Sequence, residues 1–156
     1  MKSVKISAVL LKMVFSLCIL LAAGGVYSQK ALQPYDDWTI QVLNQLRIYE
    51  ERLELTNQSH EFVTGRLDNE GTEWVTIELP AGYTYHILGV CDHDCFDLDL
   101  ELHTTENVML SSDVETDDYP LVSVTPAERT IYRVKVVMAN CSSSPCRYGL
   151  GIYRSE

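Results

Sequence analysis

The stretch that decides the fold lies in the second half of the chain and reads Cys91-Asp92-His93-Asp94-Cys95-Phe96-Asp97-Leu98-Asp99-Leu100-Glu101-Leu102. A turn bounded by two cysteines leads directly into a segment in which apolar and acidic residues alternate. Successive side chains of a β-strand point to opposite faces, so the leucines share one face and the acids share the other. The segment therefore predicts a strand with one face in the core and an acidic face outside.

Shorter segments on both sides follow the same alternating pattern and end at turn residues. The predicted strands are 61–67, 73–79, 83–90, 97–103, 108–110, 121–124, 130–138 and 147–153. No helix-length segment separates them, which excludes a parallel βαβ sheet. Short strands spaced by roughly ten residues are typical of an antiparallel β-sandwich. We expect a mostly-β fold.

One helical segment precedes the strands. Between residues 33 and 55, apolar side chains recur at steps of three and four, which places them on one stripe of a helix. This stripe comprises Trp38, Val42, Leu46, Tyr49 and Leu53. Acidic residues near its start can cap the free amides there. We expect a helix that packs on the sandwich; a helix that binds another protein is the alternative.

The chain begins with a predicted signal peptide, residues 1–28. Lys2 and Lys5 supply a basic start, the apolar run 13–23 follows, and small residues suit cleavage before Gln29. The alternative is a permanent anchor, but the apolar run is short for a membrane span. The expected organisation is therefore a leader, an N-terminal helical region at 29–58 and a sandwich domain at 59–156.

Four cysteines remain after removal of the leader: Cys91, Cys95, Cys141 and Cys146. An even number in an exported chain indicates disulfides, and four cysteines allow three pairings. We expect Cys91–Cys95 and Cys141–Cys146, because each pair bounds a short connection between predicted strands. A zinc site built from these thiolates is the alternative, although an oxidising compartment favours disulfides.

The chain is acidic. Its 156 residues carry 12 basic and 22 acidic side chains, a net charge of −10, and loss of the three leader lysines makes this −13. Such a chain repels nucleic acid and anionic membrane surfaces. We therefore expect no nucleic-acid partner, no membrane insertion after signal cleavage, and a periplasmic or extracellular location.

Six segments between residues 60 and 154 follow the order of a known module. They are Gly65-Arg66-Leu67, Trp74-Val75-Thr76-Ile77-Glu78-Leu79, Ala81-Gly82-Tyr83-Thr84-Tyr85, Asp97-Leu98-Asp99-Leu100-Glu101-Leu102, Tyr132-Arg133-Val134-Lys135-Val136 and Tyr148-Gly149-Leu150. Together they resemble the bacterial pre-peptidase C-terminal (PPC-like) domain, a β-sandwich often appended to secreted peptidases. The chain departs from that pattern at Thr130, where the family usually has glycine, and in its paired cysteines.

This resemblance implies a jelly-roll-like sandwich of about eight strands that serves exported enzymes as an accessory. Related collagen-binding modules hold calcium with carboxylates and bind protein substrates without cutting them. The module is not the catalytic part of its proteins, so no catalytic residue can be carried over to this chain.

Calcium is the one cofactor that the sequence suggests. It takes six to eight oxygen ligands, and a single strand cannot supply them, so the acidic loop at 113–118 would have to fold back onto the 97–103 strand. The candidate ligands are Asp97, Asp99, Asp92, Asp94, Asp113, Asp117 and Asp118. The alternative is a solvated acidic face that keeps an exported protein in solution.

Known catalytic motifs are missing from the sequence. It contains neither H-E-x-x-H nor G-x-S-x-G. Its four histidines are dispersed, and we expect them at the surface or at strand ends. The favoured function is a secreted, non-enzymatic binding or accessory module for a protein or polysaccharide. The alternatives are a small exported metal-dependent hydrolase and a structural protein of the cell envelope.

Overall fold

A computed structural model describes residues 35–155 of the chain. The predicted signal peptide, Cys18 and the cleavage site before Gln29 lie outside these residues. Within 35–155, no helix combines the length and the apolar character needed to cross a membrane.

One helix and eight strands make up this region. The helix α2 spans Asp37–Arg52, and the Asp36 side chain caps it by accepting a hydrogen bond from the Thr39 amide (2.7 Å). The strands are β1 Val63–Leu67, β2 Thr72–Leu79, β3 Thr84–Cys91, β4 Cys95–Thr104, β5 Met109–Asp113, β6 Leu121–Val124, β7 Thr130–Cys141 and β8 Cys146–Ser155. Each predicted strand is present, and β7 and β8 are longer than expected.

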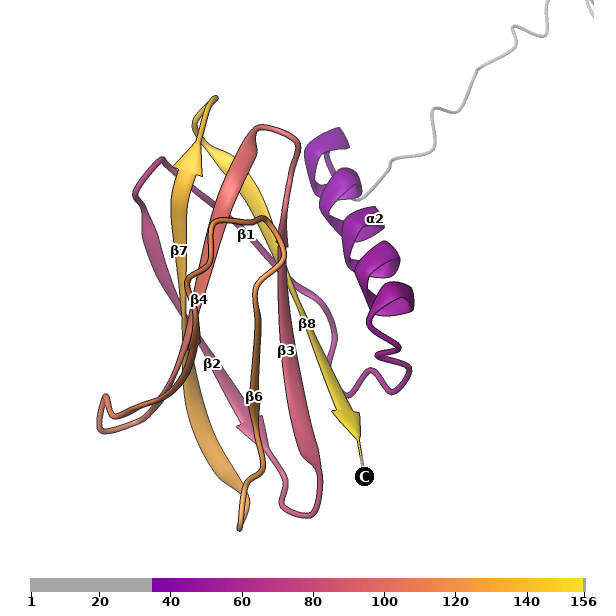
Figure 1. The fold of residues 1–156 in the computed structure, drawn as a ribbon, viewed down its shortest axis with the longest axis vertical. Helices are drawn as coiled ribbons and strands as arrows, with labels where there is room; N and C mark the ends of the chain where they lie inside the picture. The colour runs from indigo at the N-terminus through magenta and orange to yellow at the C-terminus, as the bar shows by residue number, and fades with distance from the viewer. Residues whose placement is uncertain (1–34, 156) are drawn as a thin grey trace, which may run out of the picture. The chain divides into compact units, whose positions relative to one another are not determined.

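The strands form two four-stranded antiparallel sheets (Figure 1). One sheet has the order β1-β8-β3-β6 and the other has the order β2-β7-β4-β5. The chain crosses between the sheets at every connection except β4 to β5, which is the connectivity of an eight-stranded jelly roll. The predicted mostly-β, jelly-roll-like sandwich with one N-terminal helix is confirmed.

The main core fills the space between the two sheets. Leu98, Leu100 and Leu102 of β4 are fully buried there, as their alternation with acidic residues predicts. Strand β7 shows the same alternation of buried and partly exposed positions. Strand β8 is buried at nearly every position, because α2 covers its outer face. Because the leucines of β4 face the core, the acidic side chains that alternate with them face outward.

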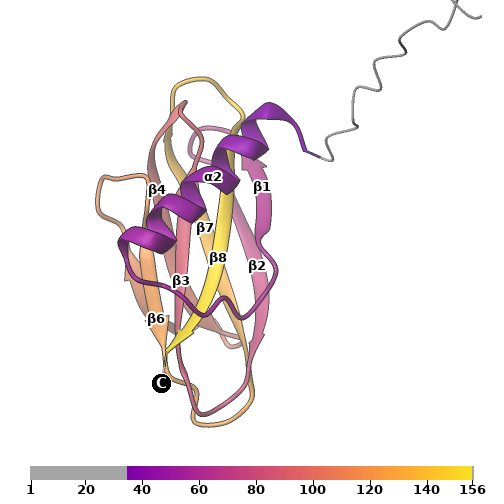
Figure 2. The same cartoon turned by 90° about the vertical axis from the view of Figure 1, so that its right-hand side faces the viewer.

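Helix α2 lies on the outer face of the β1-β8-β3-β6 sheet, across β3 and β8 (Figure 1 and Figure 2). Val42 and Leu46 are fully buried against that sheet, beside Gly149. Trp38 and Leu53, at the two ends of the predicted stripe, are 42% and 37% exposed. Trp38 lies in the first turn of the helix and Leu53 directly follows its last residue, so the sheet covers only the middle of the predicted stripe.

Both disulfides join one sheet to the other. Cys91–Cys95 links β3 to β4, and Cys141–Cys146 links β7 to β8, with Cα–Cα distances of 5.9 Å and 6.0 Å. The expected local pairing is confirmed. Since all four sulfurs are in disulfides, none is a free thiolate, and the zinc interpretation loses its ligands.

Candidate functional site

The outer face of the β2-β7-β4-β5 sheet is the candidate site. Helix α2 covers the other sheet, whereas no helix or strand among residues 35–155 covers this one. The register places outward-facing side chains in two cross-strand rows. One contains Trp74, Lys135 and Glu101, and the other contains Arg133 and His103. Residues far apart in the sequence therefore form one continuous surface.

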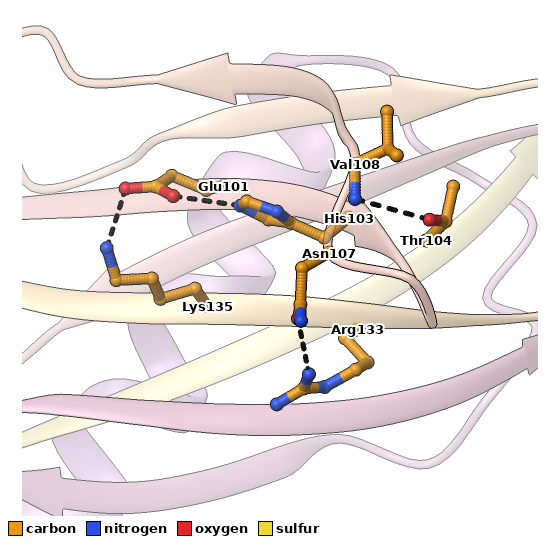
Figure 3. Close-up of polar contacts among 7 residues, drawn as sticks. All are labelled: Glu101, His103, Thr104, Asn107, Val108, Arg133 and Lys135. Atoms are coloured by element: carbon orange, nitrogen blue, oxygen red, sulfur yellow. Dashed lines mark hydrogen bonds and ion pairs between the residues drawn. The ribbon is translucent and has the colours of Figure 1, made fainter.

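A polar ladder runs across this face (Figure 3). Lys135 Nζ donates to Glu101 Oε1 at 2.9 Å, and His103 Nε2 donates to Glu101 Oε2 at 2.8 Å. These hydrogen bonds from Lys135 and His103 hold the pKa of Glu101 below its ordinary value. Glu101 therefore carries a charge that its neighbours compensate.

Trp74 is an exposed side chain that lies beside this polar ladder. It is 39% exposed, and the Arg133 guanidinium carbon lies 4.2 Å from the centroid of its ring. The His103 ring meets it edge-on, with centroids 5.1 Å apart and planes at 79°. Arg133 also donates to Asn107 Oδ1 at 2.6 Å (Figure 3). The indole is therefore held in place by a cation–π contact and an aromatic contact.

His103 lies next to the last residue of β4, as the expectation of strand-end histidines allows, but it is not at the surface. It is only 9% exposed, and its Nδ1 atom has no hydrogen-bond partner among the described residues. Trp74 covers one side of its ring and Glu101 binds the other nitrogen. Sequence alone cannot reveal this packing, because it depends on the register of β2, β7 and β4.

Exposed apolar side chains extend this surface. Val108 and Met109, at the start of β5, are 56% and 55% exposed, and Leu110 and Ile131 are nearly half exposed. Ile131 alternates with Tyr132, which is buried, so it faces outward together with Arg133. The sheet face thus combines an aromatic–arginine pair with apolar neighbours.

The acidic end of the same sheet lies at Asp97 and Asp99. The 113–118 loop folds back onto it, since the Leu98 amide donates to the Asp117 carbonyl oxygen at 2.9 Å. Burial, and secondly the Asp117 charge, raises the pKa of Asp97. The pKa of Asp99 is also raised, first by burial and then by the charges of Asp97, Glu101 and Asp113. In contrast with Glu101, neither carboxylate forms a salt bridge with a cation among residues 35–155.

The remaining candidate calcium ligands are dispersed. Asp113 and Asp117 accept hydrogen bonds from the backbone amides of Leu121 and Tyr119. Asp118 lies near Tyr49 of α2, whose pKa is raised first by burial and then by the Asp118 charge. Within residues 35–155, no three histidine, cysteine or acidic side chains are grouped so that they can hold a metal ion. The calcium site stays a prediction.

Asp92 and Asp94 belong to a different part of the molecule. They lie in the 91–95 connection, where the Asp92 carboxylate accepts a hydrogen bond from the Arg147 amide at 2.7 Å. Ser142 donates from both its amide and its hydroxyl to the Asp94 carbonyl oxygen. These contacts tie the turn to the 141–146 connection.

The aromatic–arginine pair is the part of the site that the sequence did not identify. The alternation of β2 already indicates that Trp74 faces away from the core, and an outward tryptophan is itself a signal of binding. Its partner Arg133 could not be named, because sequence does not tell which strand lies next to β2.

Comparisons with known proteins found matches among solved structures only. No family model matches the sequence, and no curated protein matches it. Among solved structures, the chain is similar to the pre-peptidase C-terminal domain of a collagenase from Bacillus anthracis, with 12% identity, a TM-score of 0.46, and coverage of 62% of this chain and 89% of that one. It is also similar to PliG of Aeromonas hydrophila, a periplasmic inhibitor of g-type lysozyme, with 10% identity, a TM-score of 0.46, and coverage of 61% and 85%. The first of these belongs to the family that the sequence resembles.

Proposed function

We propose that this chain is an exported, non-enzymatic module that binds a basic protein through the outer face of the β2-β7-β4-β5 sheet. The observation that carries the proposal is Trp74, which is exposed yet held between Arg133 and His103 on a sheet face that no described element covers.

This arrangement supports binding because most of the energy of protein interfaces comes from a few residues, with tryptophan and arginine enriched among them. A side chain that is already held loses little conformational freedom when a partner covers it. Arg133 fixes the indole before any partner arrives. Binding of a partner to Trp74 should therefore cost little side-chain conformational entropy.

A protein suits this face better than a polysaccharide. Sugars bind tryptophan by stacking on an open ring face, but Arg133 already occupies one face of the Trp74 ring. The exposed Met109, Leu110 and Ile131 offer apolar area beyond the aromatic pair. Protein interfaces combine apolar anchors of this kind with a polar rim.

The charge of the chain indicates a basic partner. Among residues 35–155, no cation hydrogen-bonds to Asp97 or Asp99. Burial raises the pKa of both, and neighbouring acidic charges add to this, from Asp117 at Asp97 and from Asp97, Glu101 and Asp113 at Asp99. Lysine or arginine side chains of a partner would relieve that repulsion. The net charge of −10 would also speed the approach of a basic protein at low salt.

Export is part of the proposal. Two disulfides are typical of chains that fold in an oxidising compartment, and the predicted signal peptide provides the route.

Panning a random peptide library against the immobilised chain tests the proposal. We expect enriched peptides to be rich in lysine or arginine with an apolar residue, and their binding to weaken with salt. Trp74→Ala and Arg133→Ala should each lower affinity by about tenfold or more. Ile48→Ala, on the exposed side of α2, and Arg154→Ala, which removes a guanidinium stacked on Tyr83 of the other sheet, are matched controls.

Two results would overturn this function. One is enrichment of acidic peptides, or of peptides whose binding does not depend on salt. The other is equal binding to Trp74→Ala, Arg133→Ala and the two control variants, with circular dichroism showing that all four are folded.

A further inference from the structure

A polar cavity lies at the end of the sandwich that carries both disulfides. Its volume is about 350 Å³, which is within the range of small-ligand sites. Four separate segments supply its walls: α2, β1, the 91–95 connection and the chain from 141 into β8. The side chains that matter are Trp38, Arg66, Asp92, Asp94, Ser144 and Arg147.

The walls of this cavity are tied to one another. Each of the two connections is closed by a disulfide, and Ser142 hydrogen-bonds to the Asp94 carbonyl oxygen through both its amide and its hydroxyl, at 2.8 Å each. The Asn69 amide of the β1–β2 turn donates to Ser144 Oγ at 2.9 Å. The cavity is therefore largely formed before a ligand enters, which lowers the cost of binding.

One side of the cavity is acidic. Asp92 is only 2% exposed; its Oδ2 accepts from the Arg147 amide, and its Oδ1 has no partner among the described residues. Burial raises the pKa of Asp92 against the opposing effect of the Arg147 and Asp94 backbone amides, and the Asp94 charge adds a smaller increase. A buried carboxylate oxygen without a partner favours a ligand that donates hydrogen bonds or carries positive charge.

The other side of the cavity is basic. Arg147 is already engaged, because its guanidinium binds Asp36 at 2.8 Å. Arg66 is exposed and forms no ion pair within residues 35–155. A smaller depression of about 230 Å³ adjoins the cavity and shares Arg66 and Arg147 with it. Arg66 is therefore free to bind a carboxylate, and Trp38, which is 42% exposed, offers an apolar wall.

We propose that this cavity binds a small zwitterion of the amino-acid or dipeptide class, with the ammonium group at Asp92 and Asp94 and the carboxylate at Arg66. A simple anion is disfavoured because two carboxylates line the same space. A simple cation would leave Arg66 without a partner. The site is separate from the outer face of the β2-β7-β4-β5 sheet, so either proposal can fail without the other.

Titration with alanyl-alanine tests this inference. The chain has two tryptophans, so the Trp74→Phe background leaves Trp38 as the reporter of the cavity. Free dipeptide should change Trp38 fluorescence in a saturable way. N-acetylation or amidation of the dipeptide should each weaken binding by about tenfold or more, because each removes one charge-assisted contact.

Two variants assign the charges without depending on the buried Asp92. Arg66→Gln should weaken the free dipeptide about tenfold and bind it no better than the C-terminal amide. Asp94→Asn should reduce the difference in affinity between the free and the N-acetylated dipeptide. Arg129→Gln, an exposed arginine paired with Glu78, is the matched control and should bind like the parent. Calorimetry with the chain that retains Trp74 checks the affinities.

Failure of the inference has a clear form. Absence of saturable binding by both fluorescence and calorimetry would overturn it. So would equal affinity for free, acetylated and amidated dipeptide, or unchanged binding in Arg66→Gln.

Discussion

Two carboxylates of β4, only two residues apart on the same face, differ in what surrounds them. Glu101 accepts hydrogen bonds from Lys135 and His103, which lower its pKa. Asp99 is partly buried beside Asp97, Glu101 and Asp113, and its pKa is raised. A lowered pKa means that the charged form stabilises the folded state, and a raised pKa means the opposite.

Replacement of these two residues should therefore shift stability in opposite directions. At neutral pH, Glu101→Gln should lower the free energy of unfolding by about 1 kcal/mol, and Asp99→Asn should raise it by about 0.5 kcal/mol. Urea unfolding of the two variants and the parent chain measures both shifts. The gain from Asp99→Asn should shrink as the pH falls through the raised pKa that Asp99 has in the folded chain. It should be absent below the ordinary aspartate value of 3.8, because the parent carboxyl is then protonated in both states. Destabilisation by Asp99→Asn at neutral pH would show that repulsion does not dominate there.

Calcium would reverse the role of Asp99. A bound cation would stabilise the folded state in proportion to its occupancy, so the melting temperature should rise with millimolar calcium more than with sodium at equal ionic strength. Asp99→Asn should remove most of that difference. Glu101→Gln is the matched control, since Glu101 is already neutralised by Lys135 and should leave the calcium response in place. An equal response to both salts would indicate simple screening and would eliminate the calcium site.

For single residues, the sequence predicts which face of a strand a side chain occupies better than it predicts which side chains lie next to it. The alternation of residues 97–102 correctly places the leucines inside and the acids outside. It could not show that Lys135 reaches Glu101, because that contact depends on the partner strand. Nor could it show that Asp92 is buried, since an aspartate in a turn is ordinarily exposed.

The contact between α2 and β8 depends on a glycine in the strand. A Cβ atom at Gly149 would lie 2.5 Å from Val42 Cγ1 and 3.1 Å from Leu46 Cδ1. The helix therefore approaches the sheet at a place where no side chain separates them. This close approach is what buries Val42 and Leu46 completely.

A double-mutant cycle tests this contact. Gly149→Ala should lower the free energy of unfolding by about 1–3 kcal/mol, because the new methyl group overpacks the interface. Val42→Ala should also destabilise by leaving a cavity. The two changes together should cost less than the sum of the single changes, because Val42→Ala removes the atom that the new methyl group would meet. Urea unfolding measures all three variants.

Gly82→Ala provides the control for this cycle. Gly82 has a φ of +94° and nothing within 4 Å of an added Cβ, so its substitution costs only backbone strain. Its effect should add to that of Val42→Ala without coupling. Additive costs for Gly149→Ala and Val42→Ala would contradict the close contact between α2 and β8.

The secondary-structure elements were the most predictable feature of this protein. Turn residues and the change from helical to alternating periodicity mark the start and end of each segment, which is why all eight strands were anticipated. The ends of α2 were less predictable, because Trp38 and Leu53 continue the apolar stripe beyond the part that the sheet covers. Periodicity describes a face but not how much of that face a neighbour covers.

At the scale of the whole described region, residues 35–155, the strands form two sheets whose order the sequence does not contain. Alternation identifies strands with one buried face, but β1 lies beside β8 and β2 lies beside β7, and neither pair is adjacent in the chain. The jelly-roll order was expected only from the resemblance to a known module. For the same reason the candidate site could not be predicted from the sequence. Trp74, Arg133 and His103 come from three strands that lie side by side only in the folded sheet.

At one end of the molecule the two sheets are joined covalently as well as by packing. Cys91–Cys95 and Cys141–Cys146 each connect a strand of one sheet to a strand of the other, and the four cysteines are at most 7% exposed. Each bridge closes a short loop, so the chain-entropy model assigns it about 2 kcal/mol. The four cysteines are part of the core between the sheets, but most of that core is formed by other apolar residues. We therefore expect the fold to survive loss of the bridges at reduced stability.

Removal of each bridge should therefore weaken the fold without abolishing it. Cys91→Ala with Cys95→Ala, and separately Cys141→Ala with Cys146→Ala, should each lower the free energy of unfolding by about 2 kcal/mol. Reduction of the parent chain should lower it by about the sum, because the two loops are separate in the unfolded chain. Urea unfolding followed by tryptophan fluorescence measures these losses. Trypsin digestion without reduction checks the pairing, since no lysine or arginine lies between the cysteines of either pair, and each bridge should remain within one peptide. A peptide that joins residues 91–95 to residues 141–146 would contradict the pairing, and complete unfolding on reduction would contradict the independence of the core.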